Sequence, residues 1–177
     1  MTGARRTDGY SRISIATHWF AALLVIALFF THEGERGSTE RMLHVSGGAI
    51  AGLFLLWRVW HRLYSGMTEK PDQAALLNLA SRIVIWGFLV AIVVVVISGY
   101  LLPWSLGRPL DFFGLASIPS PMGASRGLHE FMEELHEISG HLFPPLIALH
   151  ILGAAKHAFI GRDGIVKRMF KPVVGCK

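Results

Sequence analysis

The sequence predicts an all-α integral membrane protein built as a four-transmembrane-helix bundle, and two observations carry this prediction. Hydrophobic residues make up 52% of the 177 residues, and the mean hydropathy of +0.46 is too apolar for an ordinary soluble domain. Four stretches also approach or exceed the ~20 apolar residues that a helix needs to cross a bilayer. These predicted spans lie within a single domain, 1–177, and cover about residues 13–31, 42–64, 82–104 and 138–160.

The first predicted span, 13–31, follows a basic segment like the start of a secretory signal peptide. Its apolar run is long, however, and ends in "THEGERGSTE" without a small-residue cleavage site, so the sequence predicts a retained helix. The second span, 42–64, opens with "MLHVSGG" and closes with the basic "WRVWHRL". The third, 82–104, has no charged residue after Arg82. Its β-branched run would favour a strand in water, but a lipid-exposed span must satisfy its own backbone, so a helix is expected.

The fourth span, 138–160, is preceded by "LHEFMEELHEISGH", whose helical spacing predicts that the helix extends beyond the bilayer. Pro144 and Pro145 lie inside this span, where a kink would change the angular relation between residues on either side of them. Before it, a long Gly-, Pro- and Ser-rich loop, "SLGRPLDFFGLASIPSPMGASRG", is expected to fold over one end of the bundle.

Lysine and arginine residues alternate in density from one connection to the next. The N-terminal segment, the second connection and the C-terminal tail hold 13 of them, and the first and third connections hold 4. Because cytoplasmic segments carry the excess of basic residues, both termini of this multi-pass protein are expected to be cytoplasmic. The same distribution explains the net charge of +5 as basic residues along one membrane face, so the charge does not indicate nucleic-acid binding. Cys176 is the only cysteine, which excludes disulfides, thiolate clusters and covalent C-x-x-C-H haem attachment.

Histidines are the candidate functional residues, because histidine is rare inside membrane helices. Counting ~1.5 Å per residue places His18 and His150 at one depth, and His44 and His136 at the other. His136 and His150 are about 3.9 helical turns apart, so they project from nearly one side of the helix, about 21 Å apart. His32 is also 14 residues from His18, so depth alone leaves His32 and His44 as alternatives for the second level.

Two stacked sites, each with one histidine from either side, suit haem iron, whose two axial positions accept imidazoles. Zinc bound by four histidines is disfavoured, because two levels so far apart cannot converge on one ion. A metal or proton transporter would want buried carboxylates, and the spans contain none.

Small and basic residues near these histidines have two interpretations. Bare backbone at Gly47, Gly48 and Gly140 would let a flat macrocycle approach, and it would equally serve ordinary helix packing. Arginines at the span ends suit haem propionates, or act only as cations at the membrane surface; they are Arg41, Arg58 and Arg62.

Three motifs, "SIATHWF" at 14–20, "MLHVSGG" at 42–48 and "LHEISGHL…LIALHILGAAKH" at 135–157, resemble the bacterial dihaem cytochrome b561 family. This family is related to the cytochrome b subunits of nickel-iron hydrogenases. The resemblance covers nearly the whole chain and implies two non-covalent, bis-histidine haem b groups in a multi-pass protein of the bacterial inner membrane. It implies that His18 and His150 hold the cytoplasmic-side iron and that His44, rather than His32, holds the outer iron with His136.

The resemblance also implies electron transfer between the quinone pool, ubiquinone or menaquinone, and a redox partner. His157 and Lys156 are candidates for quinone or proton handling, since an imidazole titrates near neutrality, and a solvated surface histidine is the alternative. Relatives often carry histidine at the start of the third helix, whereas this chain has Ser81 and Arg82 there. Those two residues would have to serve in its place.

The leading expectation is a stand-alone quinone-linked membrane oxidoreductase whose partner is a soluble electron carrier or superoxide. The predicted outer connections hold four basic against eight acidic residues, which weakens the superoxide interpretation and suits a basic carrier. The alternative is an anchor and electron-relay subunit of a larger respiratory enzyme, such as a hydrogenase or dehydrogenase, with its catalytic subunit outside the membrane. A histidine-lined metal transporter is a third class.

Overall fold

A computed structural model describes residues 10–64 and 73–171 of the protein. Several residues used above lie outside this part of the chain, namely Arg5, Arg6, Lys70, Cys176 and Lys177.

Four helices are long and apolar enough to cross a membrane, as the sequence predicted. They run over Arg12–Phe30, Thr39–Tyr64, Ala75–Ser105 and Arg126–Gly161. The third span begins seven residues before the predicted Arg82, because 75–81 is itself largely apolar and continues the helix. The fourth starts at Arg126, which confirms that the helix extends well beyond its apolar part.

Local sequence explains where these helices begin and end. α1 (Arg12–Phe30) is capped by Ser11, whose hydroxyl accepts the Ser14 N–H at 3.1 Å. α2 (Thr39–Met42) is capped in the same way by Ser38. α4 (Ala75–Ser105) ends next to Gly107, whose φ of +68° is the left-handed conformation that glycine adopts without a Cβ penalty.

The second and fourth spans each contain a turn of π-helix. The second consists of α2, the π-helical η1 (Leu43–Gly47) and α3 (Gly48–Tyr64). The fourth consists of α5 (Arg126–His141), α6 (Phe143–Ala155) and the π-helical η2 (Lys156–Gly161). Single π-helical turns inside α-helices are frequent at functional sites, and these two carry His44 and His157.

The prolines of the fourth span leave its two halves nearly continuous. Helical pairing is interrupted only around Leu142, and α6 restarts with Pro144 and Pro145 in its first turn, where the missing N–H groups cost least. Backbone bonds from Leu142 to Ile138 at 3.1 Å and from Leu146 to Leu142 at 3.2 Å hold the two halves in line.

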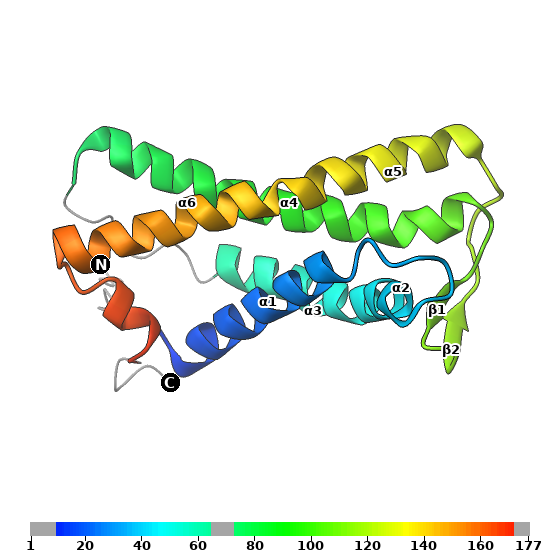
Figure 1. The fold of residues 1–177 in the computed structure, drawn as a ribbon, viewed down its shortest axis with the longest axis horizontal. Coiled ribbons are helices and arrows are strands. Elements are labelled where there is room, and N and C mark those ends of the chain that lie inside the picture. The colour runs from blue at the N-terminus through cyan, green and yellow to red at the C-terminus, as the bar shows by residue number, and fades with distance from the viewer. Residues whose placement is uncertain (1–9, 65–72, 172–177) are drawn as a thin grey trace, which may run out of the picture.

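The helices form an antiparallel bundle in which α4 packs against α5 and α6, and α3 packs against both α4 and α1 (Figure 1). Small side chains line the α3–α4 contact, and the Tyr100 hydroxyl donates to the Ala49 carbonyl at 2.6 Å. No residue of α1 is buried, and its outer surface is apolar, as expected for a helix facing lipid.

A two-stranded antiparallel hairpin lies at one end of the bundle (Figure 1). β1 (Leu110–Phe112) pairs with β2 (Ala116–Ile118), with Asp111 opposite Ser117. Leu110 is buried, and the Phe113 N–H donates to the Ser46 hydroxyl at 3.0 Å, so the hairpin is fastened to η1. The long loop therefore covers this end of the bundle, which we call the hairpin end. The opposite end, where α1 and α4 begin and α3 and η2 finish, is called the basic end after Arg12, Arg58, Arg62 and Arg82.

Candidate functional site

Two pairs of facing histidines lie inside the bundle, one toward each end. His18 on α1 and His150 on α6 have ring centroids 6.0 Å apart. His44 on η1 and His136 on α5 also have ring centroids 6.0 Å apart, with their planes perpendicular. These are the two pairs that the depth argument placed together, and they are called here the basic-end pair and the hairpin-end pair.

The rings of the hairpin-end pair are held by hydrogen bonds. His44 donates its Nδ1–H to the carbonyl of Leu28 on α1, at 2.9 Å. His136 Nδ1 lies 3.2 Å from the Ser98 hydroxyl on α4. Arg41 acts electrostatically on both rings.

The rings of the basic-end pair are held by packing. Within residues 10–64 and 73–171, neither His18 nor His150 makes a side-chain hydrogen bond; Phe88 meets the His150 ring edge-on at 5.8 Å. Arg58 and Arg62 act electrostatically on His18. The Nε of Arg58 is buried and finds no hydrogen-bond partner in the described part of the chain, which is costly for a guanidinium.

His32 lies opposite His141 rather than opposite His136. The His32 and His141 ring centroids are 6.2 Å apart, and His32 stacks on Phe29 and bonds to its carbonyl. His141 donates Nδ1–H to the Glu137 carbonyl at 2.9 Å, as expected for a hydrogen-bonded interfacial residue. This geometry favours His44 over His32 as the partner of His136.

The glycines singled out by sequence fall into two groups. A Cβ at Gly48 would lie 3.6 Å from Leu28, and one at Gly47 would lie 3.9 Å from Phe113. Both distances are ordinary van der Waals contacts, so these two glycines belong to the packing between elements. A Cβ at Gly140 would meet no atom of the described residues within 4 Å, so helix packing does not require a glycine at this position.

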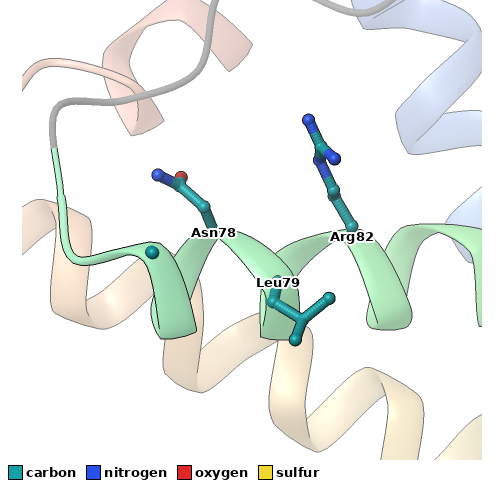
Figure 2. A pocket seen from close by; sticks show the side chains of 4 residues that line it. Asn78, Leu79 and Arg82 are labelled. Carbon is teal, nitrogen blue, oxygen red and sulfur yellow. The ribbon is translucent and has the colours of Figure 1, made fainter.

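The quinone candidates gather at the basic end. Lys156 Nζ donates to Gln73 Oε1 at 2.5 Å, and Gln73 donates to Asn78 at 3.0 Å. Asn78 and Arg82 line a pocket of about 210 Å³ together with Ala75 and Leu79, and both polar side chains project from the same side of α4 (Figure 2).

The other two quinone candidates, His157 and Ser81, lie outside this pocket. His157 donates Nδ1–H to Asp163 at 2.5 Å, on the turn that follows η2. Loss of hydration is the largest single influence on Asp163 and would raise its pKa. Hydrogen bonds from the Ile165 N–H and from His157, together with the charge of His157, outweigh it and hold the pKa of Asp163 below its ordinary value of 3.8. Ser81 is exposed and does not line the pocket.

Sequence reasoning missed Ser98 and Gly99. A Cβ at Gly99 would lie 3.0 Å from Cε1 of His136, so the ring sits directly over this glycine. The only signal for these residues was a Ser-Gly step in an otherwise apolar span, and which residue it faces depends on how α4 and α5 pack.

The residues at both levels fit a haem. Each level offers two imidazoles, the number of axial positions on haem iron, and the described residues hold no group of three or more His, Cys, Asp or Glu side chains arranged for one metal ion. The unpaired Nε of Arg58 beside His18 suits a carboxylate such as a propionate. A membrane bundle that carries paired histidines on facing helices is typical of b-type cytochromes.

Comparison with known proteins identifies the family. The sequence profile described as "Prokaryotic cytochrome b561" matches residues 9–172. The chain is 26% identical to "Cytochrome b561 homolog 2" of Escherichia coli (strain K12), over 96% of this chain and 95% of that protein. It is 24% identical to "Probable superoxide oxidase CybB" of Yersinia pestis, over 90% and 94%. The chain therefore belongs to the prokaryotic cytochrome b561 family of membrane b-type cytochromes, which transfer electrons.

Proposed function

We propose that the chain is a single dihaem domain, 1–177, in which His18 and His150 hold one haem b and His44 and His136 hold the other. The observation that carries this proposal is that two pairs of histidines, each with ring centroids 6.0 Å apart, face each other between the fourth span and the first or second span. When bound, the two groups supply one-electron carriers at two depths of the membrane.

The chain's own residues orient and neutralise the ligands. A ring that donates Nδ1–H to a fixed acceptor keeps Nε2 unprotonated for the metal, and His44 is held in this way by Leu28. Arg58 supplies a cation for a propionate at the basic end, and Arg41 acts in the same way at the hairpin end.

The basic end is proposed to face the bacterial cytoplasm. Lysine and arginine are concentrated in the segments that meet there, and cytoplasmic segments of membrane proteins carry this excess. Both termini are then cytoplasmic, and the hairpin covers the outer face.

A quinone, ubiquinone or menaquinone, is proposed to react at the basic end. Arg82 lines the 210 Å³ pocket, and Lys156 reaches the same α4 turn through Gln73. Quinone reduction takes up protons together with electrons, and the His157–Asp163 pair offers a proton-carrying group at the aqueous boundary.

Haem quantitation tests the ligand assignment. A pyridine haemochrome assay should find two haems b per wild-type chain and one in His44→Leu. His32→Leu should keep two. Loss of the outer haem in the His32 variant, with two haems kept in the His44 variant, would contradict the pairing.

The outer partner is proposed to be a small oxidant or reductant, superoxide included, or a soluble electron carrier. Similarity to a protein named as a probable superoxide oxidase supports superoxide, and Arg41 near the hairpin-end pair would attract an anion. The acidic balance of the outer connections favours a basic carrier instead. An assay of superoxide consumption by the purified protein in the presence of quinone separates these partners, because only superoxide as the outer partner predicts quinone-dependent consumption.

A second candidate role is an anchor and electron-relay subunit of a larger respiratory enzyme. The likeness to hydrogenase cytochrome b subunits favours it, and the compact chain leaves little surface for such a partner. A stoichiometric partner that survives purification in mild detergent would establish this role.

A further inference from the structure

Two serines of α4 are its most deeply buried side chains, and each contacts a histidine of α5. Ser98 and Ser105 have 1% and 0% of their surface exposed. Ser98 Oγ lies 3.2 Å from Nδ1 of His136, and Ser105 Oγ lies 3.0 Å from Nδ1 of His129. The same contact is therefore repeated one heptad apart along two antiparallel helices.

The protons in this contact can be assigned from its other hydrogen bonds. A hydroxyl has one proton, and Ser98 Oγ lies 2.6 Å from the carbonyl of Val94, which can only accept. With that proton committed, the hydroxyl offers a lone pair to the ring.

The His129 contact supports the same assignment. Nδ1 of His129 also lies 3.2 Å from the carbonyl of Leu102, and the Ser105 hydroxyl lies 2.8 Å from that same carbonyl. A carbonyl has no proton to give, so the ring nitrogen is the donor. The repeated geometry thus selects the Nδ1–H tautomer at both histidines.

We infer that Ser98 is a positioning residue for His136: its hydroxyl accepts the Nδ1–H, fixes the ring over Gly99 and leaves Nε2 unprotonated for iron. Gly99 completes this seat, since a Cβ there would lie 3.3 Å from the same Nδ1. The inference rests on the proposed function, in which His136 is an axial ligand.

Loss of this hydrogen bond should change the ligand strength of His136. An imidazole that donates Nδ1–H to an acceptor is a more basic ligand and stabilises the oxidised, more positive iron. Ser98→Ala should therefore raise the midpoint potential of the hairpin-end haem. The reduced-to-oxidised ratio at fixed potential should rise by up to about tenfold, or ~59 mV for one electron.

The chain offers a matched control in Ser139. This serine is also buried in a helix and donates to the carbonyl four residues earlier, Leu135, at 2.6 Å, but within the described part of the chain it makes no hydrogen bond to an imidazole ring. Ser139→Ala should leave both midpoints unchanged, and Ser98→Thr, which keeps the hydroxyl, should stay close to wild type.

Spectroelectrochemical titration of the detergent-purified holoprotein tests the inference, with the hairpin-end haem identified as the one that His44→Leu removes. A raised midpoint or selective loss of that haem in Ser98→Ala, with Ser98→Thr and Ser139→Ala like wild type, supports the assignment. An unchanged midpoint in Ser98→Ala overturns it, and so does an equal effect of Ser139→Ala. Failure of the proposed function is a separate outcome, because His44→Leu would then retain two haems.

Discussion

The two histidine pairs have the same spacing but are held in place by different means. At the hairpin end, both rings are tied through Nδ1, His44 to a carbonyl and His136 to a serine hydroxyl. At the basic end, His18 and His150 are held by aromatic packing and lie beside arginines. If these rings hold iron as proposed, hydrogen bonds to Nδ1 should tune ligand basicity at the hairpin end, and arginines should act without such bonds at the basic end. The two haems are therefore expected to differ in midpoint potential.

The largest expected effect comes from removing one ligand at each level. His136→Leu and His150→Leu should each lower the haem content from two to one per chain, because a single remaining axial imidazole retains haem poorly. Quantitation by pyridine haemochrome measures this loss. His141→Leu is the matched control on the same helix and should keep both haems; its loss of a haem would contradict the assigned pairs.

A smaller effect is expected from crowding one pair. Gly99→Ala places a methyl group 3.0 Å from Cε1 of His136, and such overpacking costs about 1–3 kcal/mol. The hairpin-end haem should dissociate more readily, while the basic-end haem keeps its spectrum. Thermal release of haem, followed by absorbance, measures the difference.

Gly127→Ala is the control for this substitution. A Cβ at Gly127 meets nothing within 4 Å, so the variant should release haem as the wild type does. Equal losses from both haems in Gly99→Ala would show a general destabilisation of the bundle instead.

Removing a charge should affect the other pair. Arg58→Gln deletes a cation that acts on His18, and a nearby positive charge favours the reduced, less positive iron. The basic-end midpoint should fall by the equivalent of about 1 kcal/mol, roughly fivefold in the redox ratio. A redox titration measures it, and a fall at the hairpin-end haem instead would reverse the assignment of the two levels.

The smallest effect concerns pH at the basic end. The pKa of Asp163 is held below 3.8 in the folded chain, so the stability it contributes is present above pH 3.8 and is lost as the pH falls through the lower folded value. Asp163→Asn should therefore melt earlier than wild type at pH 5–7, and the gap should close in stronger acid. A gap that widens as the pH falls would contradict this linkage.

The helices could be read from the sequence because membrane spans depend on local composition. A run of apolar residues near 20 must be helical in lipid whatever its neighbours are, so four spans appear where hydropathy placed them. Their extensions were less predictable. Residues 75–81 join α4, one π-helical turn lies inside the second span and another ends the fourth, and the sequence carries no clear signal for any of these features.

The candidate site was predictable in part. Depth counting paired His18 with His150 and left His44 and His32 as alternative partners of His136, since helical rise is a fixed length per residue. The family resemblance favoured His44. The residues alone could not make this choice, because it depends on His32 facing His141 in the folded bundle. Likewise, Arg82 lines the pocket and Ser81 does not. Which of two neighbouring residues faces a pocket depends on the rotation of α4 about its axis, and composition does not determine this rotation.

The sequence by itself determined that this protein lies in a membrane, which face its charges favour and which residues are chemically able to hold iron. Each of these properties depends on composition or on spacing along one helix. Only the tertiary structure decided which rings face each other and what fixes them, as with His136 over Ser98 and Gly99. Those contacts join α4 and α5 across 38 positions of sequence, and their register is set by side-chain packing between helices, which no local pattern encodes.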